Sequence, residues 1–461
     1  MGSGGGLRRF DANLWSENPV STGFFTQEVC VEAPQTSAGS HQRNHLRDFS
    51  SGVSAQGRFD MSERVRNFIF VSPHFPENYR NFCIRLHENG VNVLGIGDTP
   101  YDNLDWTLKE ALTEYYRVDS MEDYDSMFRA VAFFCFKYGR IDGLESNNEY
   151  WLEQDARLRE DFNIPGMKPQ MLALLKCKSS MKQYYAQAQV PCARYHLVTD
   201  LEESLAFIQK VGYPVICKPD KGVGASDTFR IDNEEELRQF HQLDLTHETF
   251  IMEEFVPGDI YSYDAIIDSR GNPLLETGNH TMVSIMDTVN NQESVAFCIE
   301  KQIKEDLRQA GRRCVRAAGV RSRFIHFEFF RLSQDHAYLG KKGTVVALEM
   351  NFRPSGGFTP DMINQACSTD VYRDWADMVT YDCLRDKGEV GRYYCVSVGL
   401  RDCRRYVHTP EQIHEKYADR IVLEQRLPDV LAMAMGDTIY LARFSTEEEM
   451  KEFIQFLTQE V

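Results

Sequence analysis

The most informative segment of this 461-residue sequence spans residues 345–354 and reads VVALEMNFRP. Residues two apart in a strand project from the same face, so Glu349, Asn351 and Arg353 are predicted to lie side by side. A carboxylate and an amide oxygen suit a hard cation such as Mg²⁺, and an arginine beyond them can hold phosphate oxygens with two hydrogen bonds. The pattern predicts a metal and phosphate site. An ordinary strand with a solvated polar face is the alternative.

A second segment, residues 324–330, places Glu328 inside the otherwise apolar and aromatic sequence FIHFEFF. Glutamate is rarely fully buried unless it has a partner. Two interpretations stay open: Glu328 binds a cation, or it forms a structural ion pair with Arg323 or Arg331. His326 lies on the same face of the predicted strand, either beside the site or as a hydrogen-bonded residue of the core.

A third segment, residues 213–227, reads YPVICKPDKGVGASD and predicts a buried strand that ends at Lys218. A lysine in that position needs an anionic partner. Backbone amides around Gly222, Gly224 and Ser226 can approach phosphate oxygens as an anion-binding nest. The loop lacks the Gly-Lys-Ser/Thr sequence of a Walker motif, and an ordinary glycine turn is the alternative.

A fourth segment, residues 250–259, reads FIMEEFVPGD and combines an apolar run with Glu253 and Glu254 before a turn. An extended backbone with apolar side chains, including Val256, can sandwich a purine while its amide and carbonyl groups read the edge of the base. A plain strand followed by a turn is the alternative.

The order and spacing of these segments resemble the ATP-grasp ligases, the family that includes biotin carboxylase, carbamoyl-phosphate synthetase and the dipeptide ligases. The resemblance covers about residues 167–378 and includes Lys178 within residues 176–180, KCKSS. One difference is Cys177, where many family members carry Asp before the first lysine. The resemblance implies ATP as the nucleotide and Mg²⁺, or Mn²⁺, as the metal.

The resemblance also implies a role for each matching residue. The residues expected to bind ATP are Lys178, Lys218, Gly222, Gly224, Ser226, Glu253, Glu254, Val256 and Asp259. Among them the two lysines contact phosphates, Glu253 and the backbone at Glu254 and Val256 hold adenine, and Asp259 contacts ribose. The expected metal ligands are Glu328, Glu349 and Asn351, and the expected catalytic residues are Arg353 and Lys218. The partner of Lys218 is then expected to be the nucleotide rather than another side chain.

Strands and helices alternate from residue 67 onward. Strands are predicted at 68–71, 91–96, 115–118 and 141–144, and helices at 77–89 and 123–138. This alternation predicts an α/β domain with a doubly wound parallel sheet. Residues 72–76, SPHFP, stand where a glycine fingerprint would follow the first strand, which disfavours a dinucleotide-binding dehydrogenase.

The whole chain is expected to comprise four parts. Residues 1–60 are rich in Gly, Ser, Asn and Gln without a helical or strand period, which predicts a flexible extension. An N-terminal β-α-β domain at 61–165 is expected to precede an α+β ATP-grasp domain at 166–390. A small, separate α+β module is expected at 391–461, with strands at 394–398 and 438–442 and helices at 410–417 and 446–456.

Composition excludes several classes of partner. The formal net charge of −18 disfavours nucleic-acid binding, because that binding depends on clustered Lys and Arg. No apolar run approaches the roughly 20 residues of a spanning helix, so no membrane partner is expected. Twelve scattered cysteines without a C-x-x-C pair predict reduced thiols and a cytoplasmic protein. A homo-oligomer stays open.

The resemblance implies a ligase that activates a small-molecule carboxylate as an acyl phosphate and couples it to an amine, releasing ADP and phosphate. Residues 278–291 lack clear periodicity and are the candidate for substrate contacts, with a surface loop as the alternative. Two other classes stay open: an ATP-binding sensor or partner-binding protein without turnover, and a small-molecule kinase.

Overall fold

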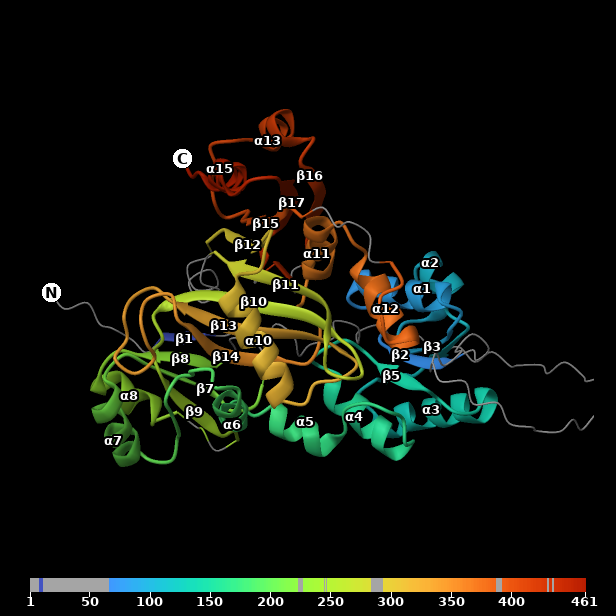
Figure 1. Cartoon of the computed structure of the whole chain (residues 1–461), viewed down its shortest axis with the longest axis horizontal. Helices are drawn as coiled ribbons and strands as arrows, with labels where there is room; N and C mark the ends of the chain where they lie inside the picture. The colour runs from blue at the N-terminus through green and yellow to red at the C-terminus, as the bar shows by residue number, and fades with distance from the viewer. Residues whose placement is uncertain are drawn as a thin grey trace, which may run out of the picture. The chain divides into compact units, whose positions relative to one another are not determined.

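The computed structural model of the chain describes residues 8–10, 66–222, 227–243, 245, 247–282, 293–386, 392–428, 431–432 and 435–461. These residues form three sheets, shown in Figure 1. Within these ranges no helix has the length and apolar character needed to cross a membrane.

The first sheet has four parallel strands in the order β4-β3-β2-β5. The strands are β2 (Asn67–Val71), β3 (Asn92–Gly97), β4 (Glu114–Arg117) and β5 (Gly143–Glu145). The helical segments are η1 (Glu77–Tyr79), α1 (Arg80–Glu88), η2 (Tyr101–Asn103), α2 (Trp106–Ala111), α3 (Tyr124–Tyr138) and α4 (Leu152–Asp161). Phe70 of β2 packs with Phe82 of α1, whereas Ile69 belongs to the cluster that contains Met127 of α3. Helices therefore cover both faces, which confirms the predicted doubly wound parallel sheet.

The second sheet has five antiparallel strands in the order β1-β8-β7-β9-β6. They are β1 (Arg8–Phe10), β6 (Tyr195–Leu197), β7 (Val215–Pro219), β8 (Thr228–Ile231) and β9 (Phe250–Glu254). Two helices, α7 (Leu201–Val211) and α8 (Glu234–Phe240), pack on one face of it. No strand was predicted in the first 60 residues. That prediction is wrong at β1, which pairs with β8.

The third sheet has eight antiparallel strands in the order β14-β13-β10-β11-β12-β15-β17-β16. They are β10 (Gly258–Ile267), β11 (Pro273–Thr281), β12 (Val295–Ile299), β13 (Arg323–Leu332), β14 (Val345–Asn351), β15 (Tyr394–Leu400), β16 (Ile421–Arg426) and β17 (Thr438–Phe444). The accompanying helices are α5 (Pro169–Leu175), α6 (Lys178–Ala188), α10 (Glu305–Ala317), α11 (Thr359–Cys367), α12 (Val371–Tyr381), α13 (Pro410–Tyr417) and α15 (Glu447–Thr458).

The C-terminal segment continues this third sheet. Strand β15 pairs with β12 from Val295↔Gly399 to Ile299↔Cys395, and β17 then pairs with β15. The segment after residue 391 was expected to be a separate module. Instead its strands extend the sheet of the preceding segment by backbone hydrogen bonds.

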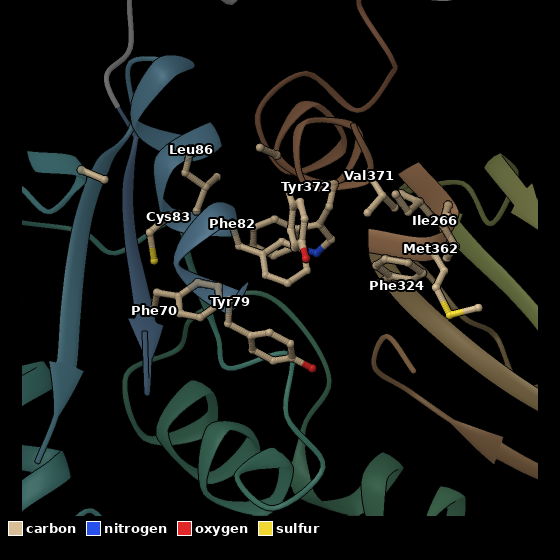
Figure 2. Close-up of a cluster of buried hydrophobic side chains, with 14 of the residues drawn as sticks. Phe70, Tyr79, Phe82, Cys83, Leu86, Ile266, Phe324, Met362, Val371 and Tyr372 are labelled. Atoms are coloured by element: carbon tan, nitrogen blue, oxygen red, sulfur yellow. The ribbon is translucent and has the colours of Figure 1, made fainter. Parts of the chain in front are cut away.

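One hydrophobic core joins the first sheet to the third. Figure 2 shows Phe70, Tyr79 and Phe82 facing Tyr372 of α12, with Phe324 of β13 on the far side of that helix. The ring of Phe82 lies 4.8 Å from that of Tyr372, edge to face. The N-terminal domain therefore packs on α12, and Phe324, from the strand that carries Glu328, belongs to the same hydrophobic core.

Candidate nucleotide and metal site

Two predicted metal ligands face each other across neighbouring strands. Glu328 of β13 is the direct register partner of Glu349 of β14, and His326 is the partner of Asn351. Side chains opposite each other in an antiparallel pair have Cβ atoms about 4.5–5.5 Å apart. Three oxygen-bearing side chains are thus gathered at the edge of the third sheet.

Glu328 is held by a histidine rather than by an arginine. His326 Nε2 lies 3.0 Å from Glu328 Oε1, and His326 Nδ1 lies 2.7 Å from Asp264 Oδ1. Arg331 pairs with Asp306 and Arg323 with Glu145, so the alternative of a structural Arg–Glu328 pair is wrong.

The two carboxylates control the charge of the histidine between them. Burial alone would lower the pKa of His326, but Asp264 and Glu328 raise it to about 9. Burial would raise the pKa of Glu328, yet His326, Arg353 and Lys218 together hold it below its ordinary value. Glu328 is therefore ionised at neutral pH, as a metal ligand must be.

Lys178 lies between the glycine loop and Glu349, a predicted metal ligand. Its Nζ donates to the carbonyl of Gly222 at 3.0 Å and lies 3.6 Å from Glu349 Oε1. Asp220 fixes the start of α6, because its carboxylate accepts from both the amide and the hydroxyl of Ser179 at 2.7 Å. The predicted contacts at Gly224 and Ser226 lie outside the described residues.

Lys218 has a side-chain partner, contrary to expectation. Its Nζ lies 2.7 Å from Glu253 Oε2, while the other carboxylate oxygen of Glu253 accepts from Lys182 of α6. Burial would raise the pKa of Glu253, but Lys182 and Lys218 lower it to about 2. Burial would lower the pKa of Lys218, and Glu253, Glu349 and Glu328 raise it. Lys218 is thus a half-buried cation that contacts Glu253 and is influenced electrostatically by two of the predicted metal ligands.

The remaining predicted nucleotide contacts follow β9. The side chain of Glu254 is bound by Arg194, with Nε and a terminal nitrogen 2.8 and 2.6 Å from Oε2. The amide of Glu254 donates to the Arg194 carbonyl at 3.0 Å. Val256 is buried, and Asp259 is exposed at the start of β10. The carboxylates of Glu253 and Glu254 are therefore both occupied by basic side chains.

Arg353 contacts the N-terminal domain. Its Nε donates to Glu149 Oε2 at 3.2 Å, and Glu149 Oε1 lies 3.8 Å from Lys176 Nζ. A small pocket lies here, lined by Glu149, Leu152, Leu175, Lys176, Met181, Gly222, Glu349, Met350, Asn351 and Phe352. The pocket brings two of the predicted metal ligands, Glu349 and Asn351, and the Glu149–Lys176 pair to one place.

The segment predicted to contact substrate is partly strand. Gly278–Thr281 lie within β11, and residues 283–291 lie outside the described residues. Within β11, Thr277 Oγ1 and Asn279 Oδ1 are buried and have no hydrogen-bond partner among the residues that the structure describes.

Sequence reasoning missed Lys182 and Glu149. Lys182 follows Lys178 by one helical turn, a spacing that could have indicated a shared face. Glu149 precedes Arg353 by 204 residues, and nothing local connects them.

The donor set fits Mg²⁺, which binds through one or two carboxylates together with phosphate oxygens. Glu328, Glu349 and Asn351 offer only oxygen atoms. In the described ranges, no three His, Cys, Asp or Glu residues gather as a metal cluster. Phosphate and water oxygens would therefore have to complete the coordination.

Comparison with known proteins gives consistent findings. Residues 211–359 match the ATP-grasp domain family. The chain is 22% identical over 371 residues to an L-arginine-specific L-amino acid ligase of Bacillus subtilis, covering 75% of this chain and 85% of that protein. A carbamoyl phosphate synthase large chain of Clostridium botulinum is 30% identical over 239 residues, which are 46% of this chain and 21% of that protein. This chain thus spans about a fifth of that relative.

A solved structure shares the fold. An L-amino acid ligase from Bacillus licheniformis superposes with a TM-score of 0.63 at 15% identity, covering 86% of this chain and 97% of that one.

Proposed function

Because this chain is an ATP-grasp domain protein related to L-amino acid ligases, we propose that it is an ATP- and Mg²⁺-dependent carboxylate–amine ligase. The observation that carries the proposal is the pairing of Glu328 with Glu349 across β13 and β14, with Lys178 3.6 Å from Glu349. Anionic metal ligands and cationic phosphate ligands are both needed where a γ-phosphate is transferred.

The proposed site divides by chemistry. Glu328, Glu349 and Asn351 hold the metal, and Lys178 and Lys218 contact phosphates. Arg353 neutralises the transferring phosphate once it leaves Glu149, its partner at 3.2 Å. Adenine contacts the backbone at Glu254 and Val256, and ribose contacts Asp259. The carboxylate of Glu253, already bound by two lysines, orients those lysines instead of reading adenine.

The proposed reaction has two steps. A substrate carboxylate oxygen attacks the γ-phosphorus, the bond from that phosphorus to the bridging oxygen breaks, and ADP leaves. The amine nitrogen then attacks the acyl carbon, loses a proton and expels phosphate. A bound Mg²⁺ would neutralise charge on the phosphate oxygens. Arg353 and the lysines supply the remaining positive charge.

Free amino acids are the first substrates to test, because the Bacillus relatives are L-amino acid ligases. Release of ADP should be measured over pools of amino acids and small carboxylates, with hydroxylamine added to trap the activated acid as a hydroxamate. We expect carboxylate-dependent ADP and phosphate, with an amide product identified by mass.

Other outcomes would contradict the proposal in distinct ways. AMP and pyrophosphate would indicate adenylation. A stable phosphorylated product would indicate a kinase. ATP binding without any carboxylate-stimulated cleavage would indicate a sensor.

A further inference from the structure

Glu253 is a buried anion shared by two cations. The residue is 5% exposed on β9, and its two carboxylate oxygens contact different lysines, Lys182 and Lys218. The two lysines come from different elements, α6 and β7. Together the three side chains carry one net positive charge.

Helix α6 brings two lysines to the same region. Lys178 and Lys182 are four residues apart and therefore project from the same side of the helix. Lys178 reaches the Gly222 carbonyl and Glu349, whereas Lys182 reaches Glu253. Both residues are buried, at 6% and 7% exposure.

The contacts of Lys218 explain why it matters that two lysines share the Glu253 carboxylate. An ammonium group has three N–H donors. One side of Lys218 faces Glu253 at 2.7 Å, and Glu328 and Glu349 act on it electrostatically. A carboxylate paired with Lys218 alone would neutralise the charge that a phosphate needs, whereas a carboxylate shared with Lys182 neutralises only part of it.

We infer that Lys182 is a positioning residue for the nucleotide site: it holds Glu253 so that Lys218 keeps its orientation and positive charge for the phosphates of ATP. The inference rests on the proposed function, because it requires a phosphate at Lys218. Lys182 acts through Glu253 and does not contact the nucleotide.

A double-mutant cycle on ATP–Mg²⁺ binding separates this role from direct contact. Lys182→Met should weaken binding by about tenfold, and Lys182→Arg should restore it to within about threefold of the wild type. In a Glu253→Gln background, adding Lys182→Met should change binding by less than about twofold, because the group through which Lys182 acts is gone. If Lys182→Met fails to fold, the comparison of Glu253→Gln with the double variant still tests the inference, because neither contains the carboxylate that Lys182→Met would leave with Lys218 alone.

Two results would overturn the inference. Equal losses from Lys182→Met in both backgrounds would mean that Lys182 contacts the nucleotide directly, which overturns the inference. No loss in either background would overturn it as well. Binding is measured by titration without acceptor substrates, so a chain that binds ATP with this coupling but forms no amide would refute the proposed ligase reaction alone.

Discussion

At the scale of single residues, Lys218 is the most informative position. Lys218→Met should lower ATP-dependent turnover by about 100-fold or more, the effect of removing one charge stabiliser from a transition state. The fold should persist, because Glu253 keeps Lys182 as a partner. Turnover and thermal unfolding measure the two effects.

The matched control is Lys221→Met, which removes an exposed lysine three residues away. It should leave turnover within about twofold of the wild type. Full activity of folded Lys218→Met would refute the assignment of Lys218.

In the proposed site, Glu328 and Glu349 are expected to make nucleotide binding depend on metal. Two carboxylates directly opposite each other repel a triphosphate unless a divalent cation lies between them. ATP should therefore bind at least about tenfold more weakly in EDTA than in Mg²⁺. Isothermal titration with and without metal measures this difference, and equal affinity would mean that the carboxylates are not metal ligands.

At the scale of elements, α4 and β5 each contribute one member of a buried pair of acidic residues, Asp155 and Glu145. Asp155 of α4 accepts from the Ser146 amide and hydroxyl, at 3.0 and 2.6 Å, and its carboxyl group interacts with that of Glu145. Burial, followed by the nearby Glu145 carboxylate, raises the pKa of Asp155 to about 7. Helix α4 therefore packs on β5 most favourably when Asp155 is protonated.

This pair predicts a pH dependence of stability. Between the unfolded pKa of about 3.9 and the folded value of about 7, the folded state holds a proton that the unfolded state has lost. The free energy of unfolding should therefore decrease as pH rises through this window, by at most about 1.4 kcal/mol per pH unit. Asp155→Asn should flatten the decrease, because its amide donates as the protonated acid does.

Urea unfolding between pH 5 and 8 measures the slope. The control is Asp119→Asn, which changes an exposed aspartate and should keep the slope of the wild type. An Asp155→Asn slope equal to that of the wild type would exclude Asp155 as the titrating group.

Local sequence signals predicted helices and strands better than they predicted which side chains form ion pairs. Helix α13 has its predicted bounds, because Pro410 follows Thr409, which forms a capping box with Gln412. The alternation in β14 correctly indicated that Glu349 and Asn351 project together. Strand β16 was missed because its side chains are all at least partly exposed and give no clear apolar signal.

The sequence could not predict which residues pair with each other as ions. Lys182 and Glu253 are 71 residues apart and Glu149 and Arg353 are 204 apart, so only the folded chain brings them together. For the same reason the sequence predicted that Lys218 has only the nucleotide phosphates as its partner. In the fold, Lys218 also contacts the carboxylate of Glu253, which it shares with Lys182.

At the scale of the whole molecule, the core around Trp375 determines whether the N-terminal sheet unfolds alone. The Trp375 ring lies 5.7 Å from Phe68 and 5.0 Å from Phe82, and both contacts are edge to face. Trp375→Ala should destabilise the protein by about 3–5 kcal/mol, because a large cavity would remain in this shared core. Urea unfolding followed by far- and near-ultraviolet circular dichroism measures the loss.

The two signals should shift together, because one core serves both sheets. Trp106→Ala is the control, since that tryptophan is 67% exposed, and it should cost less than about 0.5 kcal/mol. Separate transitions in the Trp375 variant would show that the sheets unfold independently.

The pairing of β12 with β15 also bears on how this protein can be shortened. A chain cut near residue 391 would uncover the hydrogen-bonding edge of β12, Val295–Ile299. Bare edges recruit other strands, and a chain that has lost β15 can cover this edge only with a strand of another copy, such as its β12. Removing the C-terminal segment would therefore create a point of self-association between copies, so edge-to-edge aggregation is the hazard to watch in any truncated form.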